Sequence, residues 1–330
     1  MEQIHALFRK RGSWPLKVRV RTDFIGVLLS GVIWGTLSPA GKRLGMLGTD
    51  MLYVGFLRAL VMTVGVGLFL RVCCPGKFRV RPGQLARIFL VAGPCIVGIY
   101  AGFFFALQYL SIPVTIVIFF THPLLTTAGS LFITRETPDR YQVAGALLTL
   151  AGVSVGVLMS GASLSGSLNP TGLAWVLFAS ISMSLYSLFG RLSAQTGFVP
   201  QTTLFFYIQV SGLMWLAAVK SVVSGWEGSF VLSGQQILLV SYVALIGSLV
   251  GYSLYFYSLR TVQASTASIV SSIEIVTAFA LSSILLGQPP LVNEIAGAAL
   301  IVLAIVLVGR STGIPEPERS IGIYPGKDFL

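Results

Sequence analysis

Long apolar stretches, separated by short polar segments, recur along the whole chain. A helix needs about 20 mostly apolar residues to cross the roughly 30 Å hydrocarbon core of a bilayer. Ten stretches approach or reach that length, and none alternates polar and apolar positions as a membrane β-strand would. The pattern therefore predicts an all-α membrane protein with ten transmembrane helices, over residues 24–41, 51–70, 88–109, 112–134, 141–160, 172–190, 202–219, 237–258, 264–286 and 291–309.

The second half of this pattern repeats the first. Shifting the chain by 152 residues, without a gap, aligns residues 100–148 with 252–300, so that Tyr100 meets Tyr252 and Pro138 meets Pro290. Apolar helices resemble one another by chance, but coincident Pro and Gly positions argue against chance here. We therefore expect two copies of one five-helix unit.

An odd number of helices in each copy predicts that the second copy lies inverted in the bilayer. If the N-terminus is cytosolic, 18 Lys and Arg residues fall on the cytosolic side and 3 on the outer side, and such an excess marks cytosolic loops. Both termini are therefore expected in the cytosol. The predicted organisation is a cytosolic N-terminal tail (1–23), a first repeat (24–160), an outer linker (161–171), a second repeat (172–309) and a cytosolic C-terminal tail (310–330).

The amino-acid composition also indicates a membrane protein and argues against nucleic-acid and metal binding. Only 10% of the residues are charged, against about 25% in soluble domains. The net charge of +11 lies mainly in loops and tails, which favours membrane orientation over nucleic-acid binding. Three cysteines without metal-ligand spacing predict no metal site, and we expect no cofactor.

Three ionisable residues fall deep inside the predicted helices, where a charge is costly and usually serves function: Arg58, His122 and Glu274. The 152-residue shift places His122 on Glu274, each about halfway along its helix. Arg58 could bind a carboxylate or phosphate, or pair with Glu274. Glu274 is a candidate for proton or cation coupling, and His122 could titrate or be structural beside Pro123.

Other polar and aromatic residues complete the candidate set. The aromatic residues could form walls for a planar or cationic ligand, although aromatic side chains facing lipid are common. Gln209 falls near the depth of Arg58 by symmetry, and small polar residues could line a cavity or only pack helices. The further candidates for substrate binding or coupling are Trp34, Tyr100, Phe104, Gln209, Tyr252, Phe256 and Ser271.

Short motifs that follow one another along both copies resemble those of EamA-type members of the drug/metabolite transporter superfamily, over roughly residues 24–309. Two positions depart from the family pattern: Ile275 follows Glu274 where the family has Pro, and Gln288 follows Gly287 where it has Glu. The motifs that carry the resemblance are Trp34-Gly35, Phe56-Leu57-Arg58, His122-Pro123, Arg135-Glu136, Tyr257-Ser258-Leu259-Arg260, Ser272-Ile273-Glu274 and Gly297-Ala298-Ala299-Leu300-Ile301.

The resemblance implies a secondary transporter that moves a small metabolite, an amino acid or related compound, outward across the cytoplasmic membrane. Inverted repeats imply alternating access around a midplane site. Its partners would be the substrate, the bilayer and a coupling proton or cation; we expect no catalytic residues and no nucleic acid. The alternative is a membrane-embedded lipid-modifying enzyme or a scramblase. Such an enzyme should gather catalytic residues at the membrane surface, whereas Asp50, Glu227 and Glu294 are scattered.

Overall fold

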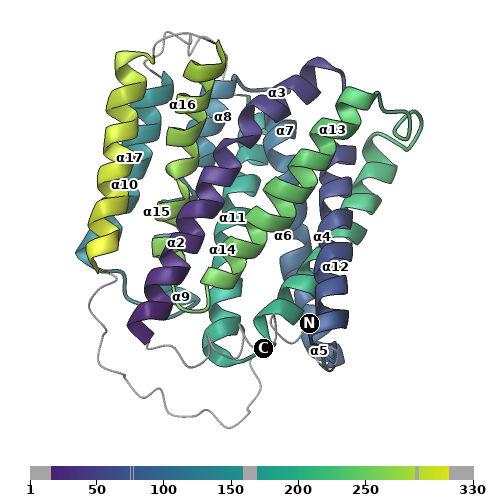
Figure 1. Cartoon of the computed structure of the whole chain (residues 1–330), viewed down its shortest axis with the longest axis horizontal. Helices are drawn as coiled ribbons and strands as arrows, with labels where there is room; N and C mark the ends of the chain where they lie inside the picture. The colour runs from purple at the N-terminus through teal and green to yellow at the C-terminus, as the bar shows by residue number, and fades with distance from the viewer. Residues whose placement is uncertain (1–15, 75, 77, 159–168, 287–289, 312–330) are drawn as a thin grey trace.

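The computed structural model describes residues 16–74, 76, 78–158, 169–286 and 290–311. Within these residues the regular structure is entirely helical, and ten segments are long and apolar enough to cross a membrane (Figure 1). The predicted all-α fold with ten transmembrane helices is therefore confirmed. The ten segments are Val20–Met46, Met51–Cys73, Pro82–Ala106, Ile112–Phe132, Arg140–Val157, Pro170–Thr196, Gln201–Val223, Gly234–Ser258, Ala264–Ile284 and Val292–Arg310.

Several spans are divided into shorter helical pieces. The first five spans consist of α2 (Leu16–Gly35) with α3 (Leu37–Met46), α4 (Met51–Cys73), α5 (Pro82–Arg87) with η1 (Ile88–Ala92), α6 (Gly93–Val97), η2 (Gly98–Gly102) and α7 (Phe103–Ala106), α8 (Ile112–Phe119) with α9 (His122–Phe132), and α10 (Arg140–Leu158). The next five consist of α11 (Pro170–Thr196), α12 (Gln201–Val223), α13 (Gly234–Tyr242) with η3 (Val243–Tyr252) and α14 (Ser253–Ser258), α15 (Ala264–Ser271) with α16 (Ile273–Leu286), and α17 (Val292–Ser311).

Helix boundaries repeat with the same 152-residue shift as the sequence. The shift moves the first residue of α5 onto that of α13, the last residue of α7 onto that of α14, the whole of α8 onto α15, and the first residue of α10 onto that of α17. In Figure 1, α8 lies above α9 whereas α15 lies below α16. This arrangement is consistent with two five-helix copies of opposite orientation.

The fourth and ninth spans are both interrupted at their middle. Pro123 is the second residue of α9, and its missing N–H suits the first turn of a helix. The ninth span breaks between Ser271 and Ile273 without any proline. At each break a hydroxyl bonds the carbonyl three residues earlier: Thr121 Oγ1 donates to Ile118 O at 2.7 Å, and Ser272 Oγ donates in the same way. Each of these carbonyls also accepts the backbone N–H of the same residue, so a side chain and a backbone group share one acceptor at each break.

Two helix pairs form the sides of the bundle. α10 packs along α17, and α4 packs along α12, so each pair joins the two copies. Glycines permit the first contact, because a Cβ at Gly297 would collide with backbone atoms of Gly152 and Gly156. We refer below to the end of the bundle where α4 begins as the Asp50 end, and to the opposite end, where α11 ends, as the Arg191 end.

Candidate functional site

Arg58 lies on α4 and reaches towards both copies of the repeat. Its Nε donates to Ser248 Oγ at 2.8 Å, and its Cζ stands 4.2 Å from the centre of the Tyr100 ring and 5.9 Å from that of Tyr252. A guanidinium over an aromatic face is attracted by the negative charge density of the ring. The side chain is only half-buried, so it keeps atoms available for a further partner.

Two π-helical segments position the partners of Arg58. Tyr100 lies in η2, while Ser248 and Tyr252 lie in η3. The wider π turn rotates side chains relative to an α-helix and is frequent at functional sites. Tyr100 and Tyr252 are equivalent under the 152-residue shift, and their rings meet at 5.7 Å. Arg58 is therefore held where equivalent segments of the two copies converge.

Glu274 lies in the first turn of α16, the second half of the interrupted ninth span. Its backbone lies against α2, since a Cβ at Gly35 would stand 2.5 Å from the Glu274 carbonyl oxygen. The carboxylate is half-buried and lies within electrostatic range of both Arg58 and Tyr252. The described residues contain no direct ion pair between Arg58 and Glu274, although the two side chains lie within electrostatic range of each other.

An aromatic cluster surrounds these charges. The Trp34 ring lies 4.6 Å from that of Tyr252 and 5.3 Å from that of Tyr255, and its indole N–H donates to Gly247 O at 3.1 Å. Tyr186 contacts Tyr252 at 6.1 Å. Phe256 then contacts Tyr186 at 5.2 Å. We call this set the aromatic cluster: Trp34, Tyr100, Tyr186, Tyr252, Tyr255 and Phe256.

The structure thus brings together six of the candidates named from the sequence. Sequence reasoning missed Ser248 and Tyr186, whose positions depend on how η3 and α11 pack. Tyr255 belongs to the same aromatic run as Tyr252 and Phe256, which the sequence already indicated as a possible ligand wall, and it follows Tyr252 by three residues on one helical face. The six candidates that converge are Trp34, Arg58, Tyr100, Tyr252, Phe256 and Glu274.

Of the remaining candidates on these helices, His122 lies elsewhere and Ser271 is bound within its own helix. The His122 ring packs against Phe119 and Phe120 at 5.4 and 5.6 Å, and the structure gives it no contact with Arg58 or Glu274. Ser271 Oγ donates to Ser268 O at 3.0 Å within its own helix. Gln209 is fully buried on α12.

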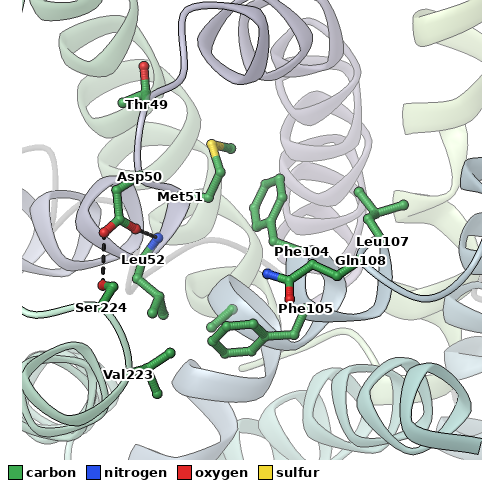
Figure 2. A pocket seen from close by; sticks show the side chains of 11 residues that line it. Thr49, Asp50, Met51, Leu52, Phe104, Phe105, Leu107, Gln108, Val223 and Ser224 are labelled. Carbon is green, nitrogen blue, oxygen red and sulfur yellow. Dashed lines mark hydrogen bonds between the residues drawn. The ribbon is translucent and has the colours of Figure 1, made fainter.

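Phe104 belongs to a different place, a pocket of about 540 Å³ at the Asp50 end. Figure 2 shows Phe104, Phe105 and Gln108 on one side of this pocket and Asp50 with Ser224 on the other. The symmetry that pairs Phe104 with Phe256 in sequence therefore does not bring Phe104 to the aromatic cluster. The pocket is lined by Thr49, Asp50, Met51, Leu52, Ala101, Phe104, Phe105, Leu107, Gln108, Val223 and Ser224.

Lys220 is a fully buried cation beside this pocket. Its Nζ donates to Asp50 Oδ2 at 2.7 Å, to Gly225 O at 2.7 Å and to Ser224 Oγ at 3.2 Å. A buried ammonium is tolerated only when it is paired and hydrogen-bonded. Although burial alone would raise the pKa of the Asp50 carboxyl, hydrogen bonds from Lys220, from Ser224 and from two backbone N–H groups hold it below its usual value.

Arg191 makes the corresponding contact at the opposite end. Its Nη2 and Nε donate to Glu136 Oε1 at 2.6 and 2.9 Å, and its Nη1 donates to the carbonyls of Leu259 at 3.3 Å and Arg260 at 3.1 Å. Asp50 and Glu136 belong to the first copy of the repeat, whereas Lys220 and Arg191 belong to the second, so each ion pair joins the two copies. Within the described residues, a charged link between the two copies is therefore found at each end of the bundle.

Ten spanning helices built from a repeated unit, with opposite charges and aromatic rings between the copies, define a membrane protein of the transporter class. The model of the EamA-like transporter family matches residues 23–158 and 170–310. The chain therefore belongs to the EamA-like transporter family, as the sequence motifs indicated.

Relatives similar in sequence are named as uncharacterized transporters. An uncharacterized transporter of Clostridium kluyveri is 24% identical over 301 residues, covering 87% of this chain and 93% of the relative. The uncharacterized transporter YvbV of Bacillus subtilis is 26% identical over 300 residues, covering 88% and 92%. The uncharacterized inner membrane transporter YedA of Escherichia coli K12 is 29% identical over 189 residues, covering 57% and 58%.

A solved crystal structure shares the fold. It superposes with a TM-score of 0.71 at 18% identity, covering 88% of this chain and 98% of that chain.

Proposed function

We propose that this transporter carries a small zwitterionic metabolite, an amino acid or related compound, between the Arg58 guanidinium and the Glu274 carboxylate. The observation that carries the proposal is that Arg58 and Glu274 lie within electrostatic range of each other, while the described residues contain no ion pair between them. Arg58 can hold a carboxylate by two parallel hydrogen bonds, and Glu274 can accept bonds from an ammonium group. Rings of the aromatic cluster offer apolar and cation–π contacts to the rest of the ligand.

Transport by alternating access is part of the proposal. Arg58 comes from the first copy of the repeat, while Glu274, Ser248 and Tyr252 come from the second. A site shared by two similar halves can open to one side and then to the other when the halves exchange conformations. The excess of Lys and Arg in alternate loops supports a cytosolic location for the Arg191 end and for both termini. Net transport is then expected to be outward.

The direct test is uptake and efflux in liposomes that contain the purified protein, with a panel of amino acids. Arg58→Ala should lower transport about 10- to 100-fold, the effect of losing one charge-assisted hydrogen bond. The matched control is Arg43→Ala, since Arg43 is exposed at the Asp50 end. Unchanged transport in Arg58→Ala would refute the site.

Coupling to protons is tested in the same liposomes. Glu274 is the acidic residue of the proposed site among the described residues, so an inward or outward pH gradient should change the transport rate of the wild-type protein. Glu274→Gln should remove that response, whereas Glu227→Gln, at an exposed loop position, should retain it. If the transport rate of the wild type does not depend on the pH gradient, proton coupling is refuted, but the proposed binding site is not.

A further inference from the structure

Two fully buried polar side chains near the aromatic cluster have no hydrogen-bond partner in the described part of the chain. They are Gln209, whose amide nitrogen and oxygen are both unpaired, and Tyr186, whose hydroxyl is unpaired. Leaving a buried polar group unbonded costs about 1–3 kcal/mol, and native proteins rarely tolerate it without a reason. Each group is therefore available for a hydrogen bond to a bound molecule.

The face of α12 that carries Gln209 points towards the aromatic cluster. Gln201, Phe205 and Gln209 follow one another at intervals of four residues and so lie on one face of the helix. At its start, Gln201 Nε2 donates to Gly190 O and to Phe256 O, both at 3.1 Å. One turn further, the Phe205 ring stacks on that of Phe256 at 5.0 Å. Gln209 is the next residue of this stripe.

The depth of Gln209 follows from the direction of its neighbours. α12 and the span from α13 to α14 are consecutive and joined by a short loop, so they run in opposite directions (Figure 1). One turn beyond Phe205 on α12 therefore corresponds to one turn before Phe256 on the adjacent span, which is the position of Tyr252. Gln209 thus lies at the level where Tyr252 approaches Arg58.

Tyr186 reaches the same level from α11. Its ring contacts both Phe256 and Tyr252, and the residue lies within electrostatic range of Tyr100, Tyr252 and Tyr255. Two of these hydroxyls have partners: Tyr255 bonds to Ser187 Oγ at 2.7 Å and Tyr100 to Met62 Sδ at 3.1 Å. Tyr186 is the tyrosine whose hydroxyl is buried within this group and unbonded.

We propose that the Tyr186 hydroxyl and the Gln209 carboxamide form a neutral polar subsite that binds a hydroxyl or amide group on the side chain of the substrate. Both groups can donate and accept, which matches the hydrogen-bonding capacity of a hydroxyl or an amide and not that of a charged or purely apolar group. The inference rests on the proposed function, in which Arg58 and Glu274 bind the charged ends of the same molecule. The subsite would then select among amino acids by their side chains.

The test compares substrates that differ by one hydroxyl. Transport efficiencies of tyrosine and phenylalanine, and of threonine and valine, are measured in liposomes for the wild type, Gln209→Met and Tyr186→Phe. We expect the wild type to favour the hydroxylated member of each pair. In each variant this preference should fall by about three- to tenfold, the worth of one neutral hydrogen bond.

Thr149→Val is the matched control. The Thr149 hydroxyl is also buried and unpaired, but it lies on α10, which packs mainly against α17. Its removal should leave both preferences unchanged. The subsite is refuted if neither Gln209→Met nor Tyr186→Phe alters the preference, or if Thr149→Val alters it equally. If the wild type moves no amino acid of the panel, the proposed substrate class fails and the subsite falls with it.

Discussion

Single residues in the interior of this protein carry charge in two different ways. Lys220 and Arg191 are each saturated by oxygen acceptors, including a carboxylate and backbone carbonyls. Arg58 instead contacts neutral groups: it donates to Ser248 Oγ and lies over the rings of Tyr100 and Tyr252. The saturated cations join helices, whereas the incompletely satisfied one retains the capacity to bind. The number of acceptors around a buried cation, and not only its depth in the protein, therefore distinguishes a structural cation from one that can bind a ligand.

The Asp50–Lys220 pair should stabilise the fold in a pH-dependent manner. Asp50→Asn keeps the N-cap of α4, because Asn caps well, but leaves the buried Lys220 without its carboxylate. We expect a loss of about 1–3 kcal/mol in the free energy of unfolding, since Asp50 is one-third exposed. Thermal unfolding in detergent at neutral pH measures the loss.

The sign of the pH effect follows from the pKa of Asp50, which is lower in the folded protein than its usual value. The carboxylate therefore contributes stability above its unfolded pKa of about 3.9, and that contribution disappears as the pH falls through the lower folded value. The difference in melting temperature between the wild type and Asp50→Asn should be constant from about pH 5 to 7 and shrink below about pH 4. A difference that grew on acidification would contradict this account.

At the scale of helices, small residues decide how closely the two copies approach. α10 and α17 touch through Gly152, Gly156 and Gly297, the spacing by which membrane helices bring their backbones together. The interrupted spans behave differently, because their breaks place Glu274 and the helix start at His122 near the middle of the ninth and fourth spans. The glycines and the residues at the breaks can be read from the sequence. Which helix packs against them depends on the tertiary structure.

Gly297→Val should separate α10 from α17. The added side chain would collide with backbone atoms and cannot rotate away from them, so we expect destabilisation of about 1–3 kcal/mol, typical of overpacking. Gly45→Val is the matched control, because a Cβ at Gly45 meets nothing within 4 Å. Melting temperatures of the two variants in detergent provide the comparison, and equal losses would show that the close contact does not matter.

At the scale of the whole molecule, polar contacts between the copies close the Arg191 end. The Arg191–Glu136 pair is accompanied there by Gln142, which donates to Thr266 Oγ1 at 2.9 Å and also bonds to Gln263. A pocket occupies part of the opposite end. Opening of the Arg191 end during transport would require these bonds between the copies to break.

Weakening this link should expose residues behind it. In a protein whose native cysteines are replaced by serine, Ser265→Cys places a thiol at a buried position near the start of α15. Adding Glu136→Gln should increase the labelling rate by a membrane-impermeant thiol reagent in inside-out vesicles, because the charged link to Arg191 is lost. Glu227→Gln should leave the rate unchanged. Equal labelling with and without Glu136→Gln would mean that other contacts hold this end closed.

The amino-acid sequence was sufficient to predict the ten spans, the repeated unit and the family, because hydrocarbon imposes length and apolarity on each helix independently of its neighbours. It also indicated Arg58 and Glu274 as candidates, since an ionisable residue in an apolar run is conspicuous. Which aromatic residues lie near these two depends on packing in three dimensions: equivalent positions in the two copies bring Tyr100 and Tyr252 together but direct Phe104 to a pocket at the Asp50 end. Side-chain partners such as Tyr186, Ser248 and Gln201 depend on how helices distant in sequence pack and rotate, and no local pattern encodes that.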